Sequence, residues 1–167
     1  AVAWMQLVGI RAAVVDVVDD RYPKVARTTH IHDAVNLQSR MLRNAIIAVS
    51  LGKNDEADGF LAKVDGAVAD NDTHMKALGA MLNTPKGTEL FAAMTSTRAD
   101  YGKSRNEAMR LVRERKWEQA GTYTLTEVRP KQEVFSRTLD AMVDFQQGLM
   151  TRSSEQVKER VAQTIVI

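Results

Sequence analysis

The stretch Asn83-Thr84-Pro85-Lys86-Gly87-Thr88-Glu89 divides this sequence into two halves and decides how they are arranged. A proline and a glycine placed so close together favour a turn. On both sides of the stretch, apolar residues recur at intervals of three and four, which is the spacing of one face of an α-helix. The chain is therefore expected to reverse direction here, between two antiparallel helices.

The two helices beside this turn are expected over about residues 55–82 and about residues 88–115. The inward face of the first is predicted to carry Leu61, Val64, Val68, Met75, Leu78 and Leu82. The inward face of the second follows the positions Phe91, Met94, Arg98, Tyr101, Arg105, Ala108 and Val112. The second face is unusual, because two arginines and a tyrosine interrupt its apolar residues.

Two further breaks separate these helices from the rest of the chain. The first is Ser50-Leu51-Gly52-Lys53-Asn54-Asp55, which combines a glycine stop with two helix-starting residues. The second lies near Arg115-Lys116-Trp117-Glu118. The outer helices are then expected over about residues 1–49 and 117–163, each about 70 Å long at the standard rise per residue. Each contains one proline: Pro23 is expected to kink or divide the first of them, and Pro130 to bend the second.

These elements predict an all-α fold: one domain of residues 1–167, built as a long antiparallel up-down four-helix bundle with both termini at the same end. Both ends are apolar, since Ala1–Ile10 reads AVAWMQLVGI and the chain stops at Ile165-Val166-Ile167. They are either packed or frayed helix ends, or stubs beside two membrane helices that this chain does not contain. Two apolar segments at one end of the bundle favour the stubs, so that end is predicted to be membrane-proximal.

The composition and the motifs exclude several classes of function. Cysteine is absent. The chain has 23 Lys and Arg and 21 Asp and Glu, so its charge is nearly balanced, unlike the one-signed surface of a nucleic-acid-binding protein. His30 and His32 point to nearly opposite helix faces, and His74 has no glutamate three residues before it, so a bundle metal site is not expected. No phosphate-binding loop or nucleophile elbow is present. We therefore expect no enzyme, metal, cofactor or nucleic-acid partner.

The interrupted face of the 88–115 helix is the candidate ligand site. Arg98 and Arg105 lie seven residues apart with Tyr101 between them, so all three side chains project from one face. A guanidinium cannot shed its proton, and burying it without a partner is costly. Its planar fork suits a carboxylate, and the tyrosine hydroxyl adds a donor, so we expect a clamp for a small carboxylate. The alternative is that the arginines reach the surface or pair with acidic residues, including those of a neighbouring helix.

Polar residues on the other helices are expected at the level of this clamp. Counting from the distal turns places Arg98 and Arg105 beside about residues 64–71, 32–40 and 126–135. Among the polar residues near these levels, Asn36, Asn71, Thr124 and Thr126 are plausible neighbours of the clamp. They are candidates for the lining of a ligand site.

Several segments resemble the four-helix-bundle sensor domains of bacterial methyl-accepting chemotaxis receptors. The string Thr97-Arg98-Ala99-Asp100-Tyr101-Gly102-Lys103-Ser104-Arg105-Asn106-Glu107-Ala108 resembles their third helix. The string Asn36-Leu37-Gln38-Ser39-Arg40-Met41-Leu42-Arg43-Asn44 resembles their first helix. The fourth helix is represented by Glu118-Gln119-Ala120, Arg129-Pro130 and Phe135. The resemblance covers roughly residues 21–163, nearly the whole chain.

The resemblance implies a periplasmic ligand-binding domain of a bacterial inner-membrane receptor, held between two membrane helices. It implies a homodimer or other homo-oligomer, in some members dependent on ligand. Signalling would displace the fourth helix by about 1–2 Å. For a clamp of two arginines and a tyrosine, the expected ligands are di- or tricarboxylates such as malate, succinate or citrate.

The sequence departs from aspartate-sensing relatives in one respect. Those relatives carry three arginines along the first helix, at the dimer interface. Here Arg40 matches one of them, whereas Ala45 and Val49 occupy the other two positions. Arg40 therefore joins the candidate ligand residues, but the comparison favours the interior clamp over a site shared between subunits.

Two other readings of the whole chain stay open. The same bundle could serve a sensor histidine kinase or a nucleotide cyclase, which only the cytoplasmic output domain distinguishes. A structural or adaptor bundle without a small ligand would leave Arg98 and Arg105 exposed or internally paired.

Overall fold

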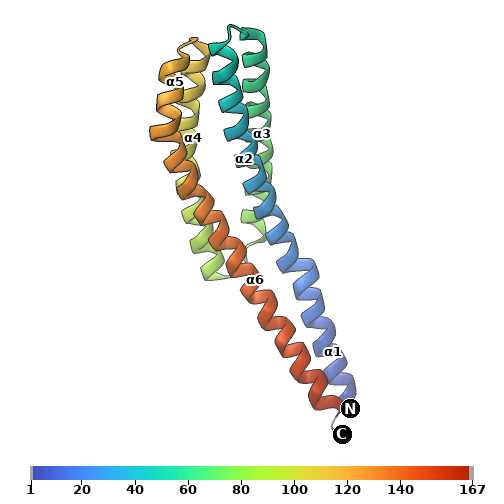
Figure 1. Ribbon diagram of the computed structural model, residues 1–167. Helices are drawn as coiled ribbons and strands as arrows, with labels where there is room; N and C mark the ends of the chain where they lie inside the picture. The colour runs from blue at the N-terminus through green and yellow to red at the C-terminus, as the bar shows by residue number, and fades with distance from the viewer. Residues whose placement is uncertain (1, 166–167) are drawn as a thin grey trace.

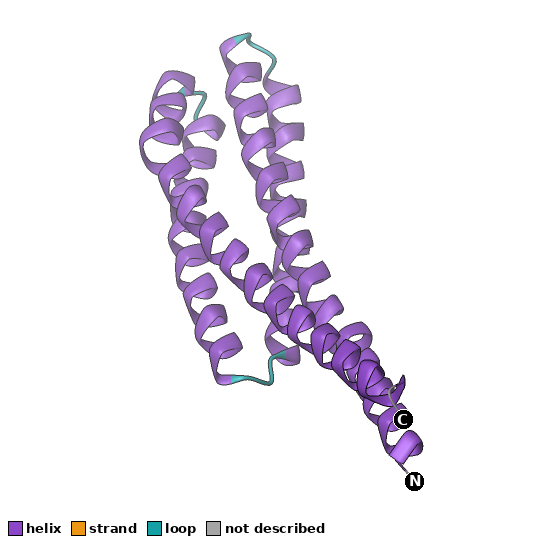
Figure 2. Ribbon diagram, turned by 60° about the horizontal axis from the view of Figure 1, so that its bottom comes forward, coloured by secondary structure: helices purple, strands orange, loops and turns teal. Residues whose placement is uncertain are grey.

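The computed structural model describes residues 2–165, which form the all-helical four-helix bundle predicted from the sequence (Figure 1). Both outer helices start or finish at the same end, and each consists of two α-helices joined by a π-helical turn. The elements in chain order are α1 (Val2–Val15), η1 (Asp16–Arg21), α2 (Tyr22–Ser50), α3 (Asn54–Met81), α4 (Pro85–Arg113), α5 (Trp117–Tyr123), η2 (Thr124–Val128) and α6 (Arg129–Ile165). The short connections, residues 51–53, 82–84 and 114–116, appear as teal loops in Figure 2.

Each outer helix has its π-turn directly before its proline. η1 and η2 both end two residues before a proline, Pro23 and Pro130 respectively. In η2 the backbone N–H of Arg129 donates to the carbonyl oxygen of Thr124, five residues earlier. Proline lacks this N–H, and its ring collides with the carbonyl four residues before it, so a wider turn relieves the clash. The bends predicted at the two prolines are therefore π-turns, and the helices continue through them.

The helix after the central turn begins earlier than predicted. Pro85 is the first residue of α4 and not part of the turn, because proline at this position needs no N–H partner and already has a helical φ. Thr84 is the N-cap, and its hydroxyl oxygen accepts a hydrogen bond from the backbone N–H of Gly87 at 3.1 Å. The connection is consequently three residues long, 82–84.

The distal turns, at the opposite end from the chain termini, use two residues with positive φ. Gly52 has a φ of 72° and Arg115 has a φ of 62°. Glycine adopts this conformation freely, whereas arginine needs support. That support comes from Asp58 on α3, whose two carboxylate oxygens accept hydrogen bonds from Arg115 at 2.9 and 2.8 Å. The ion pair thereby joins the α4–α5 connection to α3.

The core of the bundle runs between the helices as one apolar cluster. The largest fully buried apolar side chains are Ile31, Leu42, Leu78, Met94, Tyr101, Met109, Phe135, Leu139 and Met142. On α4, the predicted inward positions Met94, Tyr101, Ala108 and Val112 are buried, while Phe91 and Arg98 are half-buried. The helical spacing therefore identified the inward face of α4 correctly.

α1 and the last part of α6 extend side by side past the turn between α3 and α4 (Figure 1). This extension exposes apolar side chains, among them Trp4, Leu7, Val8, Val14 and Val18. Between residues 2 and 165, no helix is both long enough and apolar enough to cross a membrane. Of the apolar chain ends, Ala1, Val166 and Ile167 lie outside the described residues.

Candidate functional site

Arg105 of α4 is a buried cation held by neutral groups. The residue is 9% exposed, and its Nη1 donates to Oε1 of Gln38 on α2 at 2.8 Å. Its Nε and Nη2 both donate to Oδ1 of Asn106, at 3.3 and 2.9 Å. Burial lowers the pKa of Arg105, an effect that the Tyr101 phenolate, present only at high pH, and the Asp65 carboxylate oppose. Among the described residues, the hydrogen bonds of Arg105 thus go to amide oxygens only, which leave its charge unneutralised.

Tyr101 lies beside this cation with its hydroxyl unused. The side chain is 1% exposed, and the hydroxyl has no hydrogen-bond partner among the described residues. The guanidinium carbon of Arg105 lies 5.7 Å from the centre of the Tyr101 ring. Burial raises the pKa of Tyr101 to about 12, although the Arg105 charge acts in the other direction. At neutral pH the hydroxyl is therefore a protonated donor without an acceptor.

Arg98 marks the more exposed edge of the site. It forms an ion pair with the carboxylate of Asp72 on α3. The alternative reading of the sequence, an arginine paired with an acidic residue of a neighbouring helix, therefore applies to Arg98, which the exposed Asp72 reaches from α3. The pKa of Arg98 is lowered by burial and by the like charge of Arg105. The two guanidinium groups therefore repel each other across the site.

Asn71 and Gln38 complete the site from the facing helices. Gln38 is 1% exposed, and its Nε2 donates to the backbone carbonyl of Ala67 on α3 at 3.2 Å. Asn71 follows Ala67 by one turn and directly precedes Asp72; its Oδ1 is buried without a partner. Because Ala67 contacts Gln38 and Asp72 pairs with Arg98, Asn71 lies at the same level of the bundle as these residues. We call Gln38, Asn71, Arg98, Tyr101 and Arg105 the interior polar cluster.

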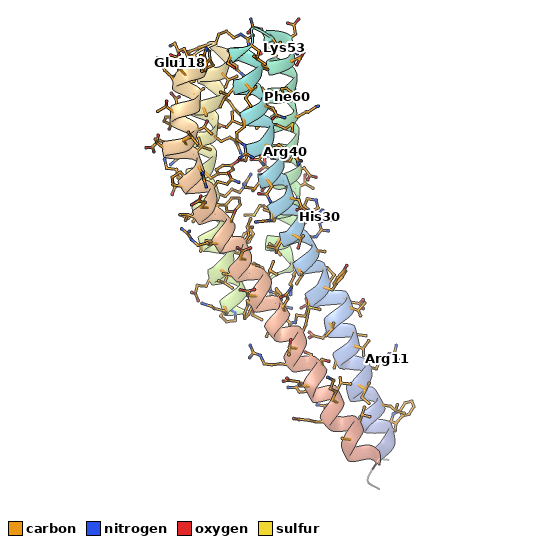
Figure 3. All side chains as sticks on the ribbon, in the orientation of Figure 1. Arg11, His30, Arg40, Lys53, Phe60 and Glu118 are labelled. Atoms are coloured by element: carbon orange, nitrogen blue, oxygen red, sulfur yellow. The ribbon has the colours of Figure 1, made fainter. Side chains whose placement is uncertain are left out.

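Three of the other candidate residues meet elsewhere, in a surface groove between α2 and η2–α6. Asn36, Arg40 and Thr124 line this groove together with Arg43 and Arg129. Figure 3 places Arg40 on α2 between the level of His30 and the distal turn that carries Lys53. The groove is basic, but it shares no lining residue with the interior polar cluster. Asn36, Arg40 and Thr124 are therefore separated from Arg98, Tyr101 and Arg105.

Thr126 lies neither in the interior polar cluster nor in the groove that Arg40 lines. Its side chain is exposed and its hydroxyl donates to the carbonyl oxygen of Thr122 at 3.1 Å. It lines an outer groove with Glu107 and Arg110. Because η2 turns Thr124 inward and Thr126 outward, the two threonines do not share a site.

Sequence reasoning missed three residues that contact the predicted arginines: Gln38, Asp72 and Asn106. Only Gln38 had a signal, because it continues the buried series Ile31, Val35, Leu42 on α2 at steps of three and four. Asp72 and Asn106 lie on exposed positions, where helical spacing predicts no contact. Their roles depend on how far the arginine side chains extend.

No metal site is apparent in the part of the chain that the structure describes. Within residues 2–165, no three His, Cys, Asp or Glu side chains are grouped so that they could hold a metal ion. His30 instead stacks on His74, with ring centres 4.8 Å apart, in the contact between α2 and α3.

Tyr101→Phe tests the buried hydroxyl without any ligand. We expect the variant to be as stable as the wild type at pH 8, or more stable by about 1 kcal/mol, because it loses an unpartnered polar group. The pKa of Tyr101 is higher in the folded state, about 12, than its ordinary 10.0. The wild type should therefore lose stability relative to the variant as pH rises above 10, by up to about 1.4 kcal/mol per pH unit. Urea denaturation at pH 8, 10 and 11 measures this, and a constant difference at all three would refute it.

A comparison with sequence families complements this geometry. A family described as a four helix bundle sensory module for signal transduction matches residues 1–161. None of the curated proteins compared with the chain matches it. The matched range contains the whole interior polar cluster and both π-turns.

Proposed function

This chain belongs to the family of four-helix-bundle sensory modules for signal transduction in chemoreceptors, and from that premise we propose that its interior polar cluster binds a small di- or tricarboxylate. Malate, succinate and citrate are the proposed ligands. The family consists of extracytoplasmic sensory domains of membrane receptors, not of catalytic domains. The proposal therefore concerns what the module binds and how it reports binding.

The unneutralised charge of Arg105 is the observation that carries the proposal. A buried cation with neutral partners is costly, and a carboxylate would convert that cost into a charge-assisted pair. The Nε and Nη2 edge of Arg105 is the two-donor edge that a carboxylate binds in bidentate fashion. Here the single Oδ1 of Asn106 occupies it. Because Asn106 is exposed, its side chain can move into water and free this edge.

Arg98 provides the second positive charge that a dicarboxylate requires. The offset of seven residues from Arg98 to Arg105 corresponds to about 10 Å along the helix, and long side chains can close much of that distance. An anion between the two guanidinium groups removes their mutual repulsion. Asp72, now paired with Arg98, is the group that the second ligand carboxylate would replace.

Neutral groups of the cluster favour a hydroxylated acid. The hydroxyl of Tyr101 is an unused donor that suits a ligand carboxylate. The Oδ1 of Asn71 is an unused acceptor that suits the hydroxyl of malate or citrate. A site that hydrogen-bonds a ligand hydroxyl should disfavour the analogue without it, because the buried acceptor then stays unpaired. We therefore expect malate to bind more tightly than succinate.

Contacts between α4 and α6 connect the proposed ligand site to α6. The ring of Tyr101 stacks on Phe135 of α6, with ring centres 6.2 Å apart. One turn away, the hydroxyls of Thr97 on α4 and Thr138 on α6 lie 3.0 Å apart. A ligand that repositions Tyr101 therefore acts on α6 directly. Helix shifts of about 1–2 Å are enough for such signalling, provided the ligand binds one state more tightly than the other.

We also propose the setting in which this module works. The receptor would be a homodimer or other homo-oligomer, with membrane helices outside this chain and the sensory module in the bacterial periplasm. A sensor kinase or cyclase carrying the same module would bind its ligand in the same way. The exposed apolar side chains of the α1–α6 extension are consistent with this setting.

A thermal-shift screen against organic acids and amino acids tests the proposal. A ligand at 100 times its dissociation constant should stabilise the domain by about 2.7 kcal/mol. Malate, succinate and citrate are expected to stabilise it, and propionate, with one carboxylate, much less. Arg98→Met should bring succinate down to the level of propionate. If no di- or tricarboxylate stabilises the domain, the sensing proposal fails and an adaptor bundle becomes the better reading.

A further inference from the structure

We propose that Gln38 acts as an internal stand-in for the ligand's carboxylate, and that its neutrality is what keeps Arg105 available to an anion. The proposal rests on the proposed function and adds a residue that controls affinity at the same site. Gln38 is one of two fully buried glutamines among the described residues; the other is Gln146 on α6. Only Gln38 contacts a buried cation.

Gln38 joins three helices through its two amide atoms. From α2, its Oε1 accepts a hydrogen bond from Nη1 of Arg105 on α4 at 2.8 Å. Its Nε2 donates to the carbonyl oxygen of Ala67 on α3 at 3.2 Å. The amide therefore holds the α2–α3 pair to α4 at the level of the site, which is where a ligand carboxylate would otherwise lie.

The charge of this side chain decides whether Arg105 attracts an anion. An amide oxygen supplies the hydrogen bond that Arg105 requires but not the negative charge that balances it. A glutamate at the same position would supply both, although it could no longer donate to the carbonyl oxygen of Ala67, and the resulting ion pair would compete with every external carboxylate. The hydrogen bond from Arg105 to this neutral amide thus holds the guanidinium in place, but it is weak enough for a ligand carboxylate to displace it.

Displacement of Gln38 would also change the link between the helix pairs. When a ligand carboxylate takes over Nη1 of Arg105, Gln38 keeps its hydrogen bond to Ala67 and remains with α2 and α3. The direct contact between α2 and α4 is then replaced by a contact through the ligand. Gln38 accordingly couples occupancy of the site to the position of α4, and through Tyr101 and Phe135 to that of α6.

Two substitutions at this position should change succinate affinity in opposite directions. Gln38→Glu is expected to weaken succinate binding at least tenfold, because it neutralises Arg105 from within. Gln38→Met removes the competing oxygen and is expected to strengthen binding severalfold, while the ligand-free domain becomes less stable. Isothermal titration calorimetry of the three proteins measures both effects.

The thermal stability of Gln38→Glu tests, without any ligand, whether a carboxylate at position 38 pairs with Arg105. We expect its melting temperature to rise by about 3 °C or more, at roughly 2–4 °C per kcal/mol for a domain of this size. Gln146→Glu is the matched control: Gln146 is also 1% exposed, but its Oε1 has no partner and its Nε2 contacts the sulfur of Met142. The control should melt at a lower temperature than the wild type, because it buries an unpaired charge.

The outcomes separate the two proposals. If Gln38→Glu is stabilised but the wild type binds no acid, Gln38 only balances Arg105 within the fold, and both the sensing proposal and the stand-in fail. If Gln38→Glu melts no higher than the wild type, or binds succinate with wild-type affinity, the stand-in is overturned. In the last case the sensing proposal survives, since the wild type still binds its ligand.

Discussion

Arg105→Met should reduce the affinity for malate or succinate by at least about 100-fold, while the ligand-free domain remains a folded helical bundle. Removing one member of a buried, hydrogen-bonded charge pair typically costs about 2–5 kcal/mol of binding free energy. Methionine has nearly the length of the arginine stem and carries no charge. Because the charge that it removes lacks an anionic partner, we expect ligand-free stability to be unchanged or higher. Calorimetric titration and thermal unfolding measure the two properties separately.

Arg110→Met is the control for this experiment. Arg110 lies on the same helix but is exposed, and it forms ion pairs with Glu107 and Glu114. Exposed ion pairs contribute about 0–1 kcal/mol, so the control should bind carboxylates as the wild type does and lose little stability. Equal affinities in Arg105→Met and the wild type would eliminate the interior polar cluster as the ligand site. The basic groove of Arg40, Arg43 and Arg129 would then be the next place to examine.

Phe135→Ala should lower the free energy of unfolding by about 3–5 kcal/mol. The side chain is 0% exposed and stacks on Tyr101, so truncation leaves a cavity between α4 and α6. Domains of this kind are stable by about 5–15 kcal/mol in total, so the loss is a large fraction of the whole. The melting temperature should fall by on the order of 10 °C, which differential scanning calorimetry measures.

The neighbouring residue provides the control for Phe135. Val134 is 39% exposed, so Val134→Ala should change stability by about 0.5 kcal/mol or less. Phe135→Leu keeps most of the volume and should fall between the two. A Phe135→Ala variant as stable as Val134→Ala would contradict the assignment of Phe135 to the core between α4 and α6.

The fold of this protein follows from local features of the sequence. The turn around Pro85, the glycine at position 52 and the helical spacing of apolar residues act over a few residues each, and together they specify four antiparallel helices. Local features do not determine every detail of the helices. Pro23 and Pro130 predict that the helices bend, but whether proline ends a helix or sits behind a π-turn depends on the packing on both sides.

The candidate site was predictable in part, because helical spacing is a local feature of the sequence. Spacing alone places Arg98, Tyr101 and Arg105 on the buried face of one helix, since their positions repeat every three or four residues. Spacing does not identify what they touch. Gln38, Asp72 and Asn106 reach the arginines from two other helices and from an exposed position of the same one.

Which residues of each helix face the core follows from the sequence alone, because the buried face of a helix repeats with a period of 3.6 residues. Only the tertiary structure decided how those faces meet. The rotation and register of α2 and α3 against α4 bring the neutral amide of Gln38 to Arg105, whereas Asn106 reaches Arg105 from the same helix. Asn36 and Arg40, equally plausible by level along the bundle, lie in a separate groove because each is two positions from Gln38 and projects from another face of α2, and Thr124 of η2 lines the same groove. The height of a residue along the bundle can be counted from the sequence. The direction in which its side chain points around the helix axis depends on the twist of every preceding turn.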